Sequence, residues 1–248
     1  MHDEAIQIDE SMFSFNHKKV EQICRWHSFS NSLELEHTVV ADIQLAAQQA
    51  IEARGTFLIV LAGGTTPRRV YEELRHIQTD WHSWHVYFGD ERCLPIDHIE
   101  RNSQMAAMAW LDHVDIPSSQ IHPIPAEKGV VIAAETYAQL LNTIALFDVV
   151  ILGLGEDGHT ASLFPDHDIG DAQDAPPTLA VLDAPKPPAH RVTLSAHRLS
   201  KARYVLFLIV GNNKANAVQD WRSAKLIPAA LITPENGVDV YIEGLGAN

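Results

Sequence analysis

The sequence predicts an α/β protein, with a single domain built on a mostly parallel, Rossmann-like sheet that carries helices on both faces. Short continuous apolar runs such as TFLIVLA (56–62) and FDVVILG (147–153) are typical of strands buried on both faces. These runs alternate with amphipathic segments such as 36–54, whose apolar residues recur on one helical face. At 248 residues and 46% hydrophobic, the chain can fill one large core.

The same patterns place the individual elements. Gly55 is expected to cap the first helix, and Thr66 to be the N-cap of a helix that starts at Pro67. Residues 1–25 are predicted to be an N-terminal extension to a domain spanning 26–248, and the Asp-, Pro- and Ala-rich segment 166–188 a long surface excursion. Further helices are expected at 102–111, 133–144 and 214–221, and further strands at 85–91, 179–182, 190–194, 204–210 and 238–242.

Composition limits the partners. With 18 Lys and Arg against 32 Asp and Glu, the net charge of −14 argues against nucleic acid or an anionic membrane as a partner. An anionic small molecule would need a few cations to converge locally. Two cysteines without a C-x-x-C pair favour a reducing compartment, and neither a secretory h-region nor an apolar run of ~18 residues is present, so a cytoplasmic protein is expected. The oligomeric state is left open.

Three loops follow predicted strands, where ligands of open parallel sheets bind. In LAGGTTPRR (61–69), Gly63 and Gly64 permit a tight bend, and the following helix directs free N–H groups into it. Thr65 adds a hydroxyl, so the loop can cradle an anion such as phosphate. An ordinary strand-to-helix turn is the alternative interpretation.

The second loop, FGDERCLP (88–95), offers Asp90 for proton work and Arg92 for an anion. A solvated acidic turn is the alternative. Cys93 has no neighbour in sequence that would activate it, and we interpret it as a small buried residue.

The third loop, GLGEDGHTASLFP (153–165), contains the G-x-G-x-x-G spacing of dinucleotide sites. Glu156 and Asp157 would repel a pyrophosphate, and Pro165 leaves room for only a short helix, so we reject a nucleotide site. The glycines instead turn the chain so that Asp157 and His159 project from the strand end. A carboxylate two residues away can orient the imidazole, which makes His159 a candidate general base. A structural role, in which His159 caps the turn, is the alternative interpretation.

Two cations complete the candidate site. Lys214, near the first turn after strand 204–210, can reach an anion at the strand ends, although a structural role is an alternative. Arg191, at the start of a predicted strand, is ambiguous alone. A histidine metal site formed by His82 and His85 with 166–168 is disfavoured, because the HSWH spacing does not suit one helix face well and does not suit one strand face.

Six segments together resemble the 6-phosphogluconolactonase family, in family order from Leu61 to about Val218. GLGEDGHTASLFP is the most specific of them. The others are LAGGTTP, FGDERCLP, RNSQMA, PKPPAHRVTL and VGNNKANAV. Two departures are Ala62 and Thr65, where the family usually has serine, and Arg101 also differs from the usual residue before Asn102. The family shares its fold with glucosamine-6-phosphate deaminases.

The resemblance implies hydrolysis of 6-phosphoglucono-δ-lactone, a small sugar phosphate, to 6-phosphogluconate in the oxidative pentose phosphate pathway, without metal or organic cofactor. It implies that His159 activates water, with Asp157 and Asp90 as acidic neighbours. It also implies that the phosphorylated sugar is surrounded by Gly63, Gly64, Thr65, Arg92, Arg191 and Lys214.

Two other functions are kept as alternatives, a deaminase and a non-catalytic sugar-phosphate sensor. After His159 the chain has no carboxylate until Asp166, whereas the deaminase family places a glutamate shortly after its histidine. A sensor would not need His159. Both considerations favour the lactonase.

Overall fold

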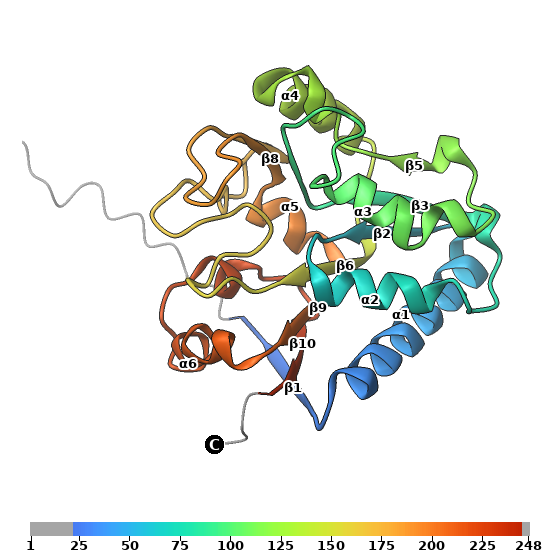
Figure 1. The fold of residues 1–248 in the computed structure, drawn as a ribbon, viewed down its shortest axis with the longest axis horizontal. Coiled ribbons are helices and arrows are strands. Elements are labelled where there is room, and N and C mark those ends of the chain that lie inside the picture. Colours follow the sequence, from blue (N-terminus) through green and yellow to red (C-terminus); the bar gives the residue numbers. More distant parts are fainter. Residues whose placement is uncertain (1–21, 245–248) are drawn as a thin grey trace, which may run out of the picture.

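The computed structural model describes residues 22–244, arranged around a seven-stranded sheet (Figure 1). The strand order is β1-β10-β9-β6-β2-β3-β5, and every neighbouring pair is parallel. The strands are β1 Cys24–Phe29, β2 Phe57–Leu61, β3 Trp84–Phe88, β5 Ile121–His122, β6 Phe147–Gly153, β9 Ala202–Val210 and β10 Val238–Glu243. The central strand β6 is buried along nearly its whole length, as its apolar run predicts.

Helices cover both faces of this sheet, as predicted. The helices are α1 Ser32–Arg54, α2 Thr65–Leu74, α3 Asn102–Ala109, α4 Val130–Leu141, α5 Ala196–Ser200 and α6 Ala215–Arg222. Single 3₁₀ turns are η2 Trp81–Ser83, η3 Leu111–His113, η4 Ser118–Gln120, η5 Ala126–Lys128, η6 Asn212–Lys214 and η7 Pro228–Leu231. Leu206 of β9 lies beside α1, whereas Phe207 packs against Trp221 of α6 with ring centroids 4.7 Å apart. Because successive strand residues point to opposite faces, α1 and α6 lie on opposite sides of the sheet (Figure 1).

A second sheet of three antiparallel strands corrects one prediction. The run 85–91 is not one strand, because it divides at Gly89 into β3 and β4 (Asp90–Arg92). The Gly89 N–H donates to Leu61 of β2, while its carbonyl accepts from Leu194 of β8 (Arg191–Leu194), so the chain passes between sheets at this residue. The order of the second sheet is β4-β8-β7, and β7 (Thr178–Val181) lies within the predicted excursion 166–188.

Helix termini show what local signals determine. In α1, the Asn31 side chain accepts from the Glu34 N–H at 2.9 Å, and Gly55 caps the other end in the left-handed conformation (φ 74°), as predicted. The predicted N-cap Thr66 is wrong. Helix α2 begins at Thr65 after Gly64, whose φ of 112° lets the chain enter the helix earlier, and no side chain caps it.

The first described residues belong to the domain. The Gln22 amide donates to the carbonyls of Ala229 and Ile232, and Cys24 pairs with Val238 of β10. The sheet therefore begins inside the predicted extension 1–25, whose first 21 residues lie outside the described part of the chain. Within residues 22–244, no helix has the length and apolar character needed to span a membrane.

Candidate active site

A cavity of about 180 Å³ opens at the carboxyl ends of β6, β2 and β3, which are neighbours in the sheet. It brings together six of the predicted residues from four separate segments. They are Gly63, Gly64, Asp90, Arg92, His159 and Arg191. Asp157 contacts this group through His159, and Thr65 lines an adjoining hollow of about 240 Å³ that shares Gly64 and Arg92 with the cavity. Lys214 lines neither.

The loop after β6 is shaped by its glycines around the imidazole. The Gly155 N–H donates to the His159 carbonyl at 2.7 Å, which closes the loop. A Cβ at Gly155 would lie 1.9 Å from His159 Nδ1, so only glycine lets the ring lie against this backbone. Gly158 has a φ of 85°, and a Cβ there would also meet Ile227 at 2.6 Å. Two of the three glycines are therefore required by packing in this loop, Gly155 by the imidazole of His159 and Gly158 by Ile227.

Asp157 holds the ring in one orientation. Its carboxylate is hydrogen-bonded to His159 Nδ1 and also accepts from the His159 backbone N–H at 3.2 Å. Since Nδ1 is engaged, the proton on that nitrogen faces the carboxylate, and Nε2 is left as the basic nitrogen. The imidazole is 18% exposed, so it is shielded yet reachable.

The electrostatics keep this imidazole neutral near pH 7. Burial lowers the pKa of His159 below its ordinary value, and the hydrogen bond and charge of Asp157 offset only part of that effect. For Asp157, burial raises the pKa, but contact with His159 more than compensates and the net pKa is lowered. A neutral imidazole beside an ionised carboxylate is the state in which a histidine can accept a proton.

Asp90 is a buried carboxylate held by neutral donors. Asn102 donates to its Oδ1 at 2.9 Å, and the Ser162 hydroxyl donates to its Oδ2 at 2.6 Å. The Asn102 amide also lies against Gly63, where a Cβ would be 2.0 Å from Asn102 Oδ1. Asn102 therefore joins the first loop to the second, and Gly63 is required for that close approach.

Glu91, next in the chain, has a structural position. It is fully buried, accepts from the backbone N–H groups of Asn102 and Ser103 at 2.7 and 2.9 Å, and so caps α3. Arg101 Nε lies 3.4 Å from the Glu91 carboxylate, and the same guanidinium donates to Glu127 at 3.0 Å. This buried network fixes the start of α3, and with it the amide that holds Asp90.

Arg191 divides its donors between the site and the chain that precedes β8. Its Nη1 donates to the Ser162 hydroxyl at 3.4 Å, while Nε and Nη2 donate to carbonyls of Lys186, Pro187 and Pro188 at 2.9–3.2 Å. Burial lowers the Arg191 pKa, the charge of Asp90 raises it, and the charge of Arg92 lowers it. Arg92 in turn donates to the Glu100 carbonyl at 2.7 Å.

Lys214 is the N-cap residue of α6, half-buried just beyond β9. Burial lowers its pKa, the charges of Glu156 and Asp157 raise it, and the charge of Lys186 lowers it. These influences indicate that the ammonium lies near the His159 loop, which is also tied to this region by the Asn213 amide donating to Glu156 at 2.7 Å.

Sequence reasoning did not assign roles to Asn102, Ser162 or Lys186. Asn102 and Ser162 lie within RNSQMA and GHTASLFP, but their shared partner Asp90 is 12 and 72 residues away. Only the fold shows that contact. Lys186, exposed in PKPPAHRVTL, is a cation whose charge lowers the pKa of His159 after the larger effects of burial and Asp157.

Other candidate groups do not gather into a site. Cys93 is half-buried, and burial raises the pKa of its thiol, which disfavours a nucleophilic thiolate. His82 is exposed, whereas His85 stacks on His122. Across residues 22–244, no three His, Cys, Asp or Glu side chains come together in a way that suits a metal ion.

The fold and the cavity define an α/β protein with a His–Asp pair and two arginines at one polar hollow beyond its strand ends. The chain belongs to the family described as glucosamine-6-phosphate isomerases/6-phosphogluconolactonase, whose model matches residues 30–241.

Its relatives include a 6-phosphogluconolactonase of Synechocystis sp. (40% identical, covering 75% of this chain and 82% of the relative). One of Homo sapiens is 36% identical, covering 84% and 86%. The crystal structure of 6-phosphogluconolactonase from Thermotoga maritima superposes with a TM-score of 0.82 at 28% identity, covering 89% of this chain and all of the other. A monomeric glucosamine-6-phosphate deaminase shares the fold, with a TM-score of 0.76 at 19% identity over 89% and 97% of the two chains.

Proposed function

We propose that the protein hydrolyses 6-phospho-D-glucono-1,5-lactone to 6-phospho-D-gluconate, a step of the oxidative pentose phosphate pathway. The observation that carries this proposal is the His159–Asp157 pair, with Nδ1 engaged and Nε2 free, at a cavity lined by Arg92 and Arg191. The relatives named 6-phosphogluconolactonase support the choice of substrate. Two free cysteines support the cytoplasm as the place of action.

The reaction needs one base and one water. His159 Nε2 takes a proton as the water oxygen attacks the lactone C1, and the carbonyl electrons move onto the oxygen to form a tetrahedral oxyanion. When the bond from C1 to the ring oxygen breaks, the imidazolium returns the proton to that oxygen. Asp157 stabilises the imidazolium and holds its orientation, in the manner of other His–carboxylate pairs.

Substrate binding would use the cations and the glycine loop. The N-terminus of α2 with Gly63, Gly64 and Thr65 presents backbone N–H groups to an anion. Arg191 and Lys214 supply positive charge for the phosphate, which fixes the lactone carbonyl near His159. Asp90 lines the same cavity and can accept a hydrogen bond from a sugar hydroxyl.

The direct test is acid release from freshly generated 6-phosphogluconolactone, measured against spontaneous hydrolysis. Purified protein should accelerate it, and should release no ammonia from glucosamine-6-phosphate. Asp166, the first carboxylate after His159, is exposed and lies outside the lining of the cavity, which leaves the longer proton relay of a deaminase without that group. Ammonia release at a comparable rate would favour the deaminase, and binding without turnover of either compound would favour a sensor.

A further inference from the structure

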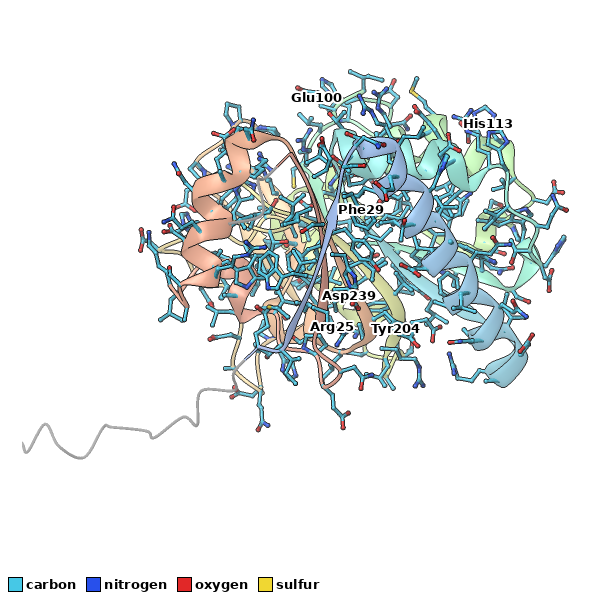
Figure 2. The ribbon with its side chains drawn as sticks, turned by 90° about the horizontal axis from the view of Figure 1, so that it is seen from below. Arg25, Phe29, Glu100, His113, Tyr204 and Asp239 are labelled. Carbon is cyan, nitrogen blue, oxygen red and sulfur yellow. The ribbon has the colours of Figure 1, made fainter. Side chains whose placement is uncertain are left out.

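A second cavity, of about 230 Å³, lies between α1 and the sheet, toward the amino ends of the strands. The candidate active site lies at the opposite, carboxyl ends of the strands. It is lined by α1 together with β1, β10, β9 and β6. Figure 2 shows Arg25, Asp239 and Tyr204 at this end of the molecule, and Glu100, from the hollow that adjoins the candidate active site, at the other. This cavity shares no lining residue with the candidate active site.

The floor of the cavity is apolar and its walls are partly aromatic. Val149, Leu206 and Ala46 are 0–8% exposed and form the base. Tyr204, 40% exposed, and the buried Tyr241 are among the wall residues. The volume is below the roughly 300–1,000 Å³ of sites for drug-sized ligands, so the occupant is small, with about one ring.

The two carboxylates of the cavity differ in how they are balanced. The Asp239 carboxylate forms an ion pair with Arg25 at 2.7 Å and contacts His27 Nε2 at 2.9 Å. Asp42, on α1, accepts only the Tyr241 hydroxyl at 2.8 Å, and it forms no ion pair with any other residue of the 22–244 region. Burial, and then the bond to Asp42, raises the pKa of Tyr241, so the phenol stays a donor. The cavity thus presents one uncompensated negative charge beside aromatic walls.

We propose that this cavity binds a small organic cation, an amine attached to a flat apolar body. The ammonium would pair with Asp42, a charge-assisted contact that is stronger than a neutral hydrogen bond. The flat body would lie on the apolar floor against the ring of Tyr204. Because aromatic faces attract cations, this wall also favours a positively charged ligand. An anionic ligand is disfavoured by the same carboxylate.

The test is calorimetric titration of the full chain with tyramine, compared with 4-ethylphenol, the neutral analogue that lacks the amino group. Tyramine should bind and 4-ethylphenol should bind at least about tenfold more weakly, which corresponds to roughly 1.4 kcal/mol. Asp42→Asn keeps an acceptor for Tyr241 and removes the charge, so it should weaken tyramine by a similar factor. The matched control Glu52→Gln removes an exposed charge from the same helix outside the cavity and should leave binding unchanged.

Three results would overturn the proposal. They are an absence of heat with tyramine at millimolar concentration, equal affinity for tyramine and 4-ethylphenol, and unchanged affinity in a folded Asp42→Asn protein. A Tyr204→Ala variant keeps the test independent of Asp42, since loss of the aromatic wall should also weaken tyramine.

Discussion

Asp148 and Asp90 are both buried carboxylates at an end of the central sheet, but their partners differ. Asp148, at the amino end of β6, pairs with Arg54 and with Arg203 at 3.3 Å, and accepts the Leu58 N–H at 2.9 Å. Asp90, in β4 just beyond the carboxyl end of β3, is hydrogen-bonded only by neutral groups, the amide of Asn102 and the hydroxyl of Ser162. Arginines neutralise the first charge, whereas the second remains available to a ligand. We therefore distinguish a structural end of the sheet, the amino ends of its strands, from a chemical end, the carboxyl ends where the candidate active site lies.

The largest effect is expected at the chemical end. Replacing His159 by Gln should lower kcat by about 10²–10⁴-fold, the range for loss of a general base, because glutamine cannot take the proton from water. The thermal midpoint should change little, since the side chain is at the cavity surface. Near-normal turnover in a folded variant would contradict the role of His159, and with it the assignment of catalysis to the carboxyl ends of the strands.

A matched pair of substitutions tests the comparison itself. Asp148→Asn leaves Arg54 and Arg203 without a counter-charge and should lower the free energy of unfolding by about 2 kcal/mol. This is less than the roughly 3–5 kcal/mol of a fully buried pair, because both arginines are exposed by about two-fifths. Its kcat should be retained.

Asp90→Asn should show the reverse, with a lower kcat/KM and a stability change within about 1 kcal/mol. Chemical denaturation and the lactone assay on both variants decide the matter. Equal loss of stability in the two, or equal loss of activity, would erase the distinction between the ends.

The pH profile sharpens the account of the His–Asp pair. The working form of His159 is neutral and its pKa lies below the ordinary 6.5, so kcat/KM should fall only as pH drops through that lowered value. Asp157 raises the pKa, so Asp157→Asn should lower it further and move the acid limb to lower pH. The plateau should fall too, because the ring loses its orientation. Movement of the limb to higher pH would contradict this electrostatic account.

The smallest effect concerns the phosphate. Lys214→Ala should raise KM for 6-phosphogluconolactone by about tenfold, the scale of one charge-assisted hydrogen bond, and affect unphosphorylated gluconolactone less. Arg191 is a poorer test, since three of its contacts hold the backbone at Lys186, Pro187 and Pro188. Equal changes in KM for both lactones would exclude a phosphate contact for Lys214.

Much of the fold could be predicted because parallel strands that are buried on both faces have continuous apolar sequences. The runs at 56–62 and 147–153 became β2 and β6 almost residue for residue. The strands that were missed lack that signal. β1, CRWHSF, lies at the edge of the sheet and mixes charged with aromatic residues, and β5 has two residues. The sequence predicts β3 and β4 as one strand, because no local signal marks Gly89 as the residue where the chain passes from one sheet to the other.

The candidate site was predictable in its loops and not in its internal bonds. Glycines at the end of an apolar run, followed by a proline near the start of a helix, are local signals, so the residues of each loop could be named. Which donors hold Asp90 depends on how β4, α3 and the loop after β6 pack, a property of the whole fold. The same limit hid the role of Glu91, which reads as part of an acidic turn in sequence and is a buried helix cap in the structure.

The pairing of β1 with β10 has a consequence for the growing chain. Cys24 to Phe29 align with Val238 to Glu243, so the first strand of the sheet cannot pair until the last strand has been synthesised. At ribosomal rates of about 5–20 residues per second, on the order of ten seconds or more pass between the synthesis of β1 and that of its partner. During that interval Trp26 and Phe29 have no sheet against which to bury. A ribosome stalled before residue 238 should therefore hold a chain whose first strand is open to proteases and chaperones, although the segments of the candidate active site, which end near Lys214, have all been made.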